Sequence, residues 1–118
     1  MADLSVQTLS AEGGGAITFA NAAAGGDKFI YDAAAHIVIR NDDASSKTVT
    51  VTPGTTSLVD TQNGLLAKNP IALAVAAGAV AVIPPLPSLF KNGSDLNKVA
   101  ITYSAVTSLK IAIVKTAK

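Results

Sequence analysis

The stretch HIVIRNDDASSKTVTVT, residues 36–52, decides the fold class of this 118-residue chain. Ile37 and Ile39 fall on one face of an extended segment, and valine alternates with lysine or threonine from residue 47 to residue 52. The polar run 41–46 between them is typical of a turn, because Asn, Asp and Ser side chains satisfy turn backbone groups locally. Alternation on both sides of a turn predicts two strands joined as a hairpin, each with one buried face.

The same alternation recurs along the chain. Further strands are predicted at residues 4–9, 16–20, 28–31, 71–75, 79–83, 98–103 and 108–114. Residues 76–78 predict a second hairpin turn, and residues 61–68 are expected to form one helical turn or a long loop. The chain has 22 alanines, which are poor strand formers, but its alanine runs are too short to form stable helices. We therefore predict an all-β protein, a single antiparallel β-sandwich; the strand spacing is also typical of a barrel.

The N-terminus is predicted to be a separate element. Residues 1–15 are expected to be an arm with a glycine hinge at residues 13–15, and residues 16–118 to be the sandwich domain. Leu4, Val6 and Leu9 are the candidate partner-binding residues, because such an arm can add as a strand to a neighbouring sheet. The alternative is that the arm pairs within its own domain.

Composition leaves the chain little chemistry. The absence of cysteine excludes disulfides and thiolate ligands, and a single histidine excludes a multi-histidine metal site. His36 has no nucleophile motif to serve, so it is expected to be a strand residue. Asp42 and Asp43 offer too few ligands for a cation and are expected in a solvated turn. We predict no catalytic residue, no cofactor and no metal, and we expect the protein not to be an enzyme.

Charge and hydropathy also limit the partners. A net charge of +1 gives no general attraction to nucleic acid or to an anionic membrane. The longest apolar run, residues 71–83, is shorter than the roughly 20 residues that cross a bilayer. Residues 1–60 carry seven acids and three bases, net −4, whereas residues 91–118 carry five bases and one acid, net +4. These halves would form a dipole if the fold separates them, and would mix if the strands interleave.

Three groups of segments carry a resemblance to a known family. They are residues 17–19 with 25–29, residues 36–41 leading to 48–51, and residues 77–78 followed by 83–86, Phe90 and 99–104. Together these segments resemble small β-sandwich proteins of tailed bacteriophages, and the chain is similar to head decoration, or cement, proteins. The resemblance implies a jelly-roll-like sandwich without catalytic residues.

The resemblance also implies partners and a location. It implies a homo-oligomer, a trimer or a dimer, that binds the major capsid protein on the outer surface of the phage head after synthesis in the host cytoplasm. We expect neither nucleic acid nor a membrane as a partner. The alternative function is a small carbohydrate- or surface-binding module. It would need exposed aromatic side chains in a groove, and Tyr31 and Tyr103 side by side on an open sheet face would favour it.

Overall fold

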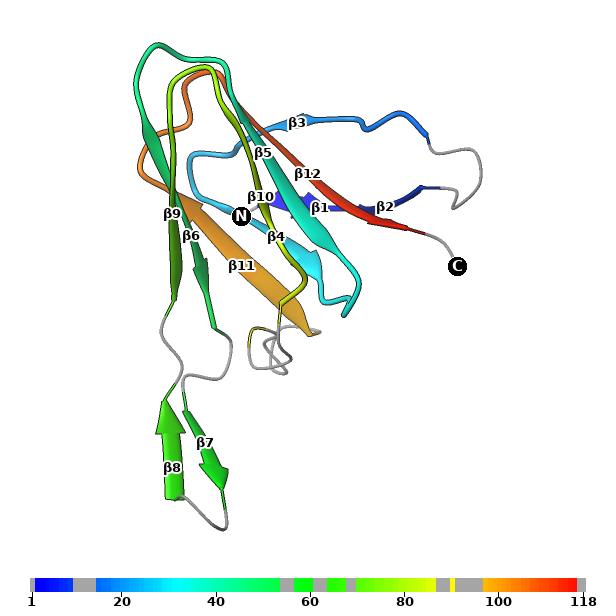
Figure 1. The fold of residues 1–118 in the computed structure, drawn as a ribbon, viewed down its shortest axis with the longest axis vertical. Coiled ribbons are helices and arrows are strands. Elements are labelled where there is room, and N and C mark those ends of the chain that lie inside the picture. Colours follow the sequence, from blue (N-terminus) through cyan, green and yellow to red (C-terminus); the bar gives the residue numbers. More distant parts are fainter. Residues whose placement is uncertain are drawn as a thin grey trace.

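The prediction of an all-β protein is confirmed. A computed structural model describes residues 2–9, 15–53, 57–60, 64–67, 70–86, 90 and 97–116, and the described residues contain twelve strands and no α-helix (Figure 1). None of the described segments is a helix of the length and apolarity that crossing a membrane requires. The strands are β1 (Ala2–Leu4), β2 (Val6–Leu9), β3 (Ala20–Asn21), β4 (Asp27–Ile30), β5 (His36–Asn41), β6 (Lys47–Thr52), β7 (Ser57–Asp60), β8 (Gly64–Ala67), β9 (Ile71–Val75), β10 (Val80–Ile83), β11 (Lys98–Tyr103) and β12 (Leu109–Thr116).

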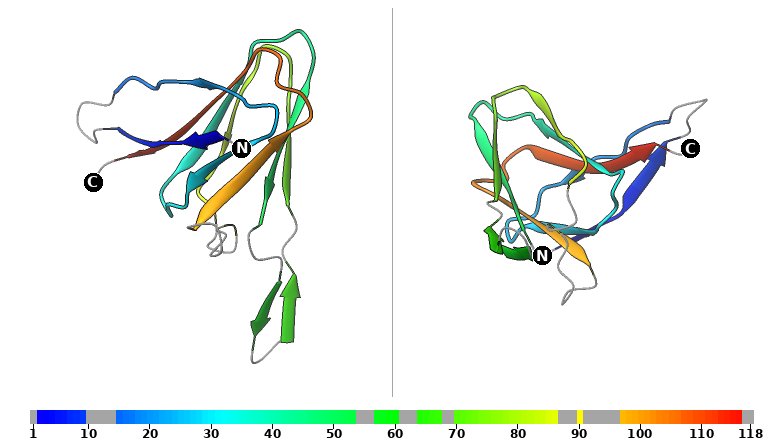
Figure 2. Two further views of the ribbon diagram at one scale, coloured as in Figure 1. Left: turned by 180° about the vertical axis from the view of Figure 1, so that it is seen from behind. Right: turned by 60° about the horizontal axis from the view of Figure 1, so that its bottom comes forward.

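Two sheets pack face to face as a sandwich (Figure 2). The first sheet has the strand order β1-β4-β11-β6-β9, and the second has the order β10-β5-β12-β2 with β3 beside β12. Both sheets are mixed, because β1 pairs with β4 and β2 pairs with β12 in parallel, whereas the other pairings are antiparallel. The strands β7 and β8 pair only with each other and project from the sandwich as a separate hairpin (Figure 1).

Both predicted hairpins are wrong in their pairing. β5 lies in the second sheet and β6 in the first, and β9 and β10 are divided in the same way. Each turn is therefore an arch that carries the chain across the core from one sheet to the other. The arch lets the apolar faces of both strands meet a common core, so that Ile37 and Ile39 on β5 and Val49 and Val51 on β6 are all 0% exposed.

The core lies between the two sheets and draws on the inward positions of both. Alternate residues of β5 and β6 are buried, as the period-two pattern predicts. The largest fully buried side chains are Phe29, Phe90, Ile37, Ile39, Ile101, Leu109, Ile111, Ile113, Val49, Val51, Val75 and Val99.

The N-terminal segment pairs inside its own chain. Leu4 on β1 and Val6 on β2 pack against the core, and Leu9 is half-buried. A Cβ atom added to Gly15 would lie 3.2 Å from Leu9 Cδ2, so the chain returns close to β2 at that residue. Of the two alternatives for the N-terminus, the structure contains the pairing within the domain for residues 2–4 and 6–9. The proposed hinge residues Gly13 and Gly14 lie outside the described residues.

One further expectation is corrected. Residues 64–67 form strand β8, whereas residues 61–68 had been expected to form a helical turn or a loop. Strand β8 pairs antiparallel with β7, and Leu58 lies opposite Leu66. Residues 61–63 and 68 lie outside the described part of the chain.

Candidate functional site

His36 is not part of a catalytic arrangement in the described residues. It is half-buried on β5, opposite Val114 of β12, and has no hydrogen bond to an acid or a hydroxyl there. The nearest acid in sequence, Asp32, is engaged elsewhere: its Oδ2 accepts a hydrogen bond from Lys115 Nζ at 2.8 Å, and its Oδ1 accepts one from Ala34 N at 2.9 Å. The bond from Lys115 holds the pKa of Asp32 below its ordinary value. His36 is a strand residue, as expected.

Asp42 and Asp43 form ion pairs within the turn between β5 and β6. Asp42 Oδ2 lies 3.1 Å from Arg40 Nε, and the guanidinium of Arg40 lies over the ring of Phe19, 4.8 Å from its centre. Asp43 binds the ammonium group of Lys47. No group of three or more His, Cys, Asp or Glu residues that could hold a metal occurs among the residues described.

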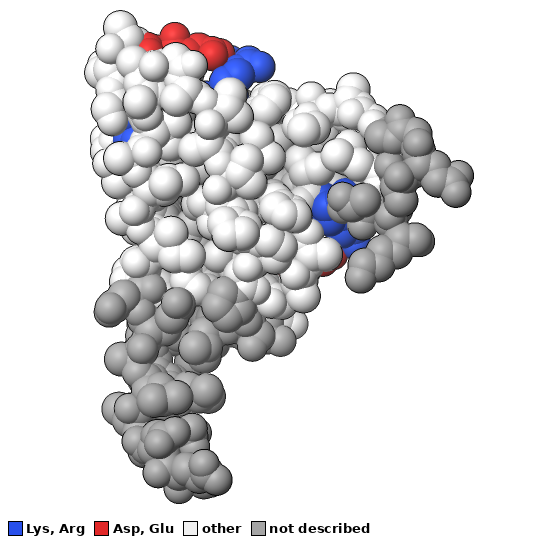
Figure 3. All heavy atoms as spheres, in the orientation of Figure 1, with Lys and Arg blue, Asp and Glu red and all other residues white. Residues whose placement is uncertain are grey.

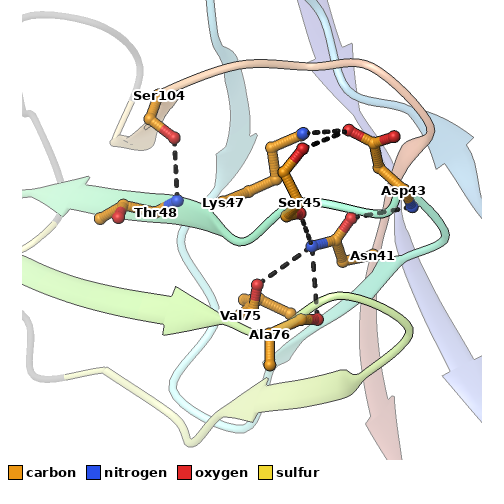
Figure 4. Close-up of polar contacts among 8 residues, drawn as sticks. All are labelled: Asn41, Asp43, Ser45, Lys47, Thr48, Val75, Ala76 and Ser104. Atoms are coloured by element: carbon orange, nitrogen blue, oxygen red, sulfur yellow. Dashed lines mark hydrogen bonds and ion pairs between the residues drawn. The ribbon is translucent and has the colours of Figure 1, made fainter.

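Asn41 joins two arches that are far apart in sequence (Figure 4). Its Nδ2 donates to the carbonyl oxygen of Ser45 at 2.9 Å within the β5–β6 arch, and its Oδ1 accepts from the backbone N–H of Asp43 at 3.1 Å. The same Nδ2 donates to the carbonyl oxygens of Val75 and Ala76, at 3.0 and 3.3 Å, where the β9–β10 arch begins. Asn41 is 0% exposed, and its bond to Val75 is buried, whereas the other three bonds are partly buried.

Lys47 completes this polar cluster. The residue is only 4% exposed, and its ammonium group binds Asp43, which holds the pKa of Asp43 below its ordinary value. Beside it, Thr48 N–H donates to Ser104 Oγ at 2.9 Å, which ties the β11–β12 connection to β6. The cluster therefore fixes the arches at one end of the sandwich, and the ammonium group of Lys47 is paired with Asp43 inside it.

A second buried polar pair ties β4 to β11. Asp27 is 0% exposed, and its Oδ2 accepts a hydrogen bond from the Tyr103 hydroxyl at 2.5 Å and one from Ala23 N at 3.2 Å. Asp27 Oδ1 has no partner among the described residues. Burial and the neighbouring Asp27 raise the pKa of Tyr103 far above its ordinary value, so the hydroxyl remains a donor.

The two tyrosines are not side by side. Tyr31 N–H bonds to the carbonyl of Asn97 at the start of β11, and Tyr103 lies six residues further along that strand, roughly 20 Å away at 3.3 Å per residue. The Tyr31 hydroxyl donates to the carbonyl oxygen of Leu86 at 2.7 Å. The arrangement that would have favoured the carbohydrate-binding alternative, two neighbouring tyrosines on one face, is therefore not present.

The oppositely charged halves of the sequence interleave. Asp3 Oδ1 lies 3.0 Å from Lys98 Nζ, and Asp32 pairs with Lys115, so acids of residues 1–60 bind lysines of residues 91–118. Of the two alternatives for the charge distribution, a dipole or a mixture, these ion pairs fit the mixture. A cavity of about 440 Å³ lies beside β1, and its charged residues Asp3, Asp32 and Lys98 all belong to these ion pairs.

The sandwich has two flanks of different character. The polar flank is formed by the edge strands β1 and β2; it carries the Asp3–Lys98 ion pair, and Gln7 on β2 binds the backbone of Thr18 through both amide atoms. The apolar flank is formed by the edge strands β9 and β10. Residues 69–90, which contain both of these strands, include no charged residue. Val80 and Val82 on β10 are 60% and 52% exposed.

A groove of about 310 Å³ runs along the apolar flank between β9 and the end of β10. Ile71 and Leu73 form one side of it, and Val82 and Leu86 contribute to the other. Ile71 and Leu73 face inward, opposite fully buried valines of β6, yet they are only half-buried. The inner face of β9 is therefore incompletely covered by the second sheet.

The predicted partner-binding residues and the apolar flank lie on opposite sides of the sandwich. Leu4, Val6 and Leu9 belong to the polar flank, where Leu4 and Val6 pack against the core of their own chain and Leu9 is half-buried. Sequence reasoning missed the apolar flank, although the charge-free run 69–90 was a visible signal. Comparison with protein-family models, with curated proteins and with solved structures gives no significant match.

Proposed function

We propose that this chain is a non-enzymatic structural protein of a bacteriophage virion. It acts as a decoration or cement protein that binds the major capsid protein on the outer surface of the head and stabilises contacts between capsomers. The sequence resemblance and the all-β sandwich support this proposal. A sandwich tied at its arches by a buried polar cluster gives a stiff body, which a lattice-bound protein needs.

The observation that carries the proposal is how the charged and polar groups are used. Asn41, Lys47, Asp27 and Tyr103 are engaged in joining strands of the fold. On the face over β5, β10 and β12, the charged atoms of described residues lie at the margins, and the expanse between them is uncharged (Figure 3). Such a face is suited to binding another protein surface. Many weak identical contacts on one shell act together through effective concentration, and binding only the assembled shell favours assembly.

Co-sedimentation with phage heads tests the proposal. Purified protein is added to mature heads that lack it, and the heads are pelleted. We expect binding that saturates at a fixed number of copies per head, together with a higher temperature of head disruption. A run without heads serves as the control, and the protein should then stay in the supernatant. A protein that never pellets with heads and is missing from purified virions contradicts the proposal.

A further inference from the structure

The cavity beside β1 lies where that strand leaves the edge of β4. β1 pairs with β4 as far as Leu4, opposite Phe29, and the chain then crosses at Ser5 to β2 in the second sheet. The edge of β4 beyond Phe29 is therefore not covered by β1. The space that remains, about 440 Å³, falls within the range of roughly 300–1,000 Å³ that small-molecule sites in proteins occupy.

A backbone carbonyl oxygen is left free at this edge. Tyr31 N–H donates to the carbonyl oxygen of Asn97 on β11, so the backbone groups of the preceding residue, Ile30, point the other way, towards β1. The pairing of Leu4 with Phe29 is the last one in the register of β1 and β4, so no later residue of β1 donates to the Ile30 carbonyl oxygen. Because Ile30 lines the cavity, this acceptor is available to a ligand there.

Two polar side chains of the lining also have hydrogen-bonding capacity left over. Asp3 accepts the hydrogen bond from Lys98 Nζ through Oδ1, and its Oδ2 accepts none from the described residues. The hydroxyl of Ser5, which can both donate and accept, has no partner in the part of the chain that the structure describes. Together with the Ile30 carbonyl oxygen, these groups give a ligand three places at which to form hydrogen bonds.

The rest of the lining is largely apolar. Leu4, Val6 and Tyr31 are half-buried, and the Ile30 side chain is 60% exposed. The hydroxyl of Tyr31 is bonded to the carbonyl oxygen of Leu86 at 2.7 Å, which fixes the position of the ring. An apolar wall next to a few free donors and acceptors is the usual composition of a small-molecule site. It suits a compact ligand that has one less polar face and a polar rim.

The charges of the lining are already balanced, which favours an uncharged ligand. Asp3 is paired with Lys98 at 3.0 Å, and Asp32 is paired with Lys115 at 2.8 Å. An ammonium group would have to displace one of these lysines, and an anion would lie against two carboxylates. Hydroxyl groups can bond to Asp3 Oδ2 and to Ser5 while both ion pairs remain intact.

We propose that this cavity binds a neutral sugar. The hydroxyl groups of the sugar bond to Asp3 Oδ2, to the Ser5 hydroxyl and to the carbonyl oxygen of Ile30. The less polar face of its ring packs against Tyr31 and against the exposed side chain of Ile30. The site uses a single tyrosine, so it does not need the pair of neighbouring tyrosines that the sheet faces lack. The inference concerns small-molecule binding alone and does not rest on the proposed function.

Titration of the full chain, followed by proton–nitrogen correlation NMR, tests the proposal. The probes are D-glucose, D-galactose and N-acetyl-D-glucosamine. A ligand of this size with few hydrogen bonds binds weakly, so we expect a Kd of about 1–10 mM for at least one of the three. The amide signals of residues 4–6 and 30–32 should shift and saturate. The absence of a saturable shift with any of the three sugars overturns the proposal.

Two variants and a matched control test whether binding uses this lining. Ser5→Val removes the hydroxyl, and Ile30→Asp places a charge in the apolar wall; both residues are exposed, so both variants should fold. We expect Ser5→Val to raise the Kd about three- to tenfold, because one hydrogen bond is lost, and Ile30→Asp to raise it at least as much. Thr50→Val on β6, which does not line the cavity, should bind as the wild type does. Unchanged affinity in Ser5→Val and Ile30→Asp contradicts the proposal.

A fourth probe tests the charge of the ligand. n-Butylamine carries an ammonium group on an apolar chain, and it should leave the amides of residues 4–6 and 30–32 unshifted at concentrations where the sugar saturates them. If n-butylamine shifts these amides at lower concentrations than the sugars do, the cavity binds a cation and the proposal is wrong. Because no phage head is present, these results are independent of the co-sedimentation experiment.

Discussion

The two flanks of the sandwich differ in the side chains that their edge strands carry. On the polar flank, the edge strands carry an ion pair between Asp3 and Lys98 at 3.0 Å and a two-bond contact between Gln7 and the backbone of Thr18 at 2.7 and 2.8 Å. On the apolar flank, Val80 and Val82 are more than half exposed on a strand without a polar side chain. Both flanks belong to the same two sheets, so the difference lies in the residues at the edges and not in the fold.

This difference indicates which side of the molecule is available to a partner. A sheet edge with charged and hydrogen-bonded side chains resists strand addition, because a new strand would have to displace them. An uncharged edge with outward backbone groups accepts a strand at little cost. The edge strands of the polar flank are therefore protected by side-chain contacts within the chain, whereas the edge strand β10 of the apolar flank is not protected by a charged or hydrogen-bonded side chain. The predictions below alter one flank at a time.

Deleting residues 1–12 should have the largest effect. The deletion removes β1 and β2, so β4 and β12 lose the strands that pair with them on that flank. It also removes Leu4 and Val6 from the set of side chains packed against the core. We expect a loss of at least about 3 kcal/mol of unfolding free energy, since each half-buried aliphatic side chain alone contributes on the order of 1–2 kcal/mol. Urea denaturation measures this loss.

The same deletion separates the two interpretations of the N-terminus. As an arm for a partner, residues 1–12 would affect partner binding more than the melting temperature. As edge strands of the sandwich, they affect the melting temperature strongly, and the truncated protein also self-associates through its new edges. A truncated chain that melts within about 2 °C of the full chain contradicts the second interpretation, because 3 kcal/mol corresponds to more than about 10 °C in a domain of this size.

Replacing Asn41 should have the next largest effect. Asn41→Leu removes the donor that serves the carbonyl oxygens of Val75 and Ala76, at the point where the chain leaves β9 for β10. The carbonyl oxygen of Ala76 still accepts from Ala79 N–H, so the buried carbonyl oxygen of Val75 is the one that loses its side-chain donor. Such a loss costs on the order of 1–3 kcal/mol, and we expect a total loss of roughly 2 kcal/mol. Urea denaturation again gives the value. Because Asn41 holds the arch of the apolar flank, amide exchange should accelerate most at residues 75–79.

Ser104→Ala is the matched control for Asn41→Leu. It removes a single exposed hydrogen bond, to Thr48 N–H, at the same end of the sandwich. The expected loss is about 1 kcal/mol or less, because water can replace an exposed acceptor. Equal losses for the two variants would show that Asn41 has no special part in holding the arches.

The alternation of residues 36–52 predicted the strands correctly but not their partners. A period of two along the sequence shows which side chains of a strand point inward. Both a hairpin and an arch are compatible with that pattern. The sequence held a clue to the arch: Asn41 shares the inward parity of Ile37 and Ile39, and Lys47 shares that of Val49. Polar residues at inward positions on both sides of one turn indicate a buried polar cluster, which a two-stranded hairpin with one wet face does not require.

The site was less predictable than the fold for a related reason. Leu4, Val6 and Leu9 were chosen because they are apolar near a glycine-rich segment, and apolar character does not distinguish a neighbour's sheet from the chain's own. The parallel pairing of β1 with β4 and of β2 with β12 depends on long-range topology, which local sequence patterns do not contain. The apolar flank depended on the same topology, since only the strand order shows that β9 and β10 are edges.

Gln7→Ala should have a smaller effect that is confined to the polar flank. The side chain of Gln7 substitutes for a pairing strand beside residues 15–19, since it both donates to and accepts from the backbone of Thr18. Both bonds are exposed, so we expect a loss of about 1 kcal/mol. Hydrogen exchange should show faster exchange of the Thr18 amide, with little change in the amides of β9 and β10. Protection lost equally on both flanks would mean that the flanks are not independent.

Acid should weaken the Asp3–Lys98 pair of the polar flank and the Asp32–Lys115 pair through their carboxylates. Near neutral pH we expect this to be the smallest of the four effects. Hydrogen bonds from Lys98 and Lys115 hold the pKa values of Asp3 and Asp32 below the ordinary value of 3.8. Because the folded pKa lies below the unfolded one, the stabilisation is complete above about pH 4 and is lost as the pH falls through the folded value. The melting temperature should therefore be level from pH 7 to about pH 5 and decline below pH 4. The double variant Asp3→Asn/Asp32→Asn should melt lower at pH 7 and decline less steeply in acid. A variant as acid-sensitive as the wild type would place the titrating groups outside the polar flank.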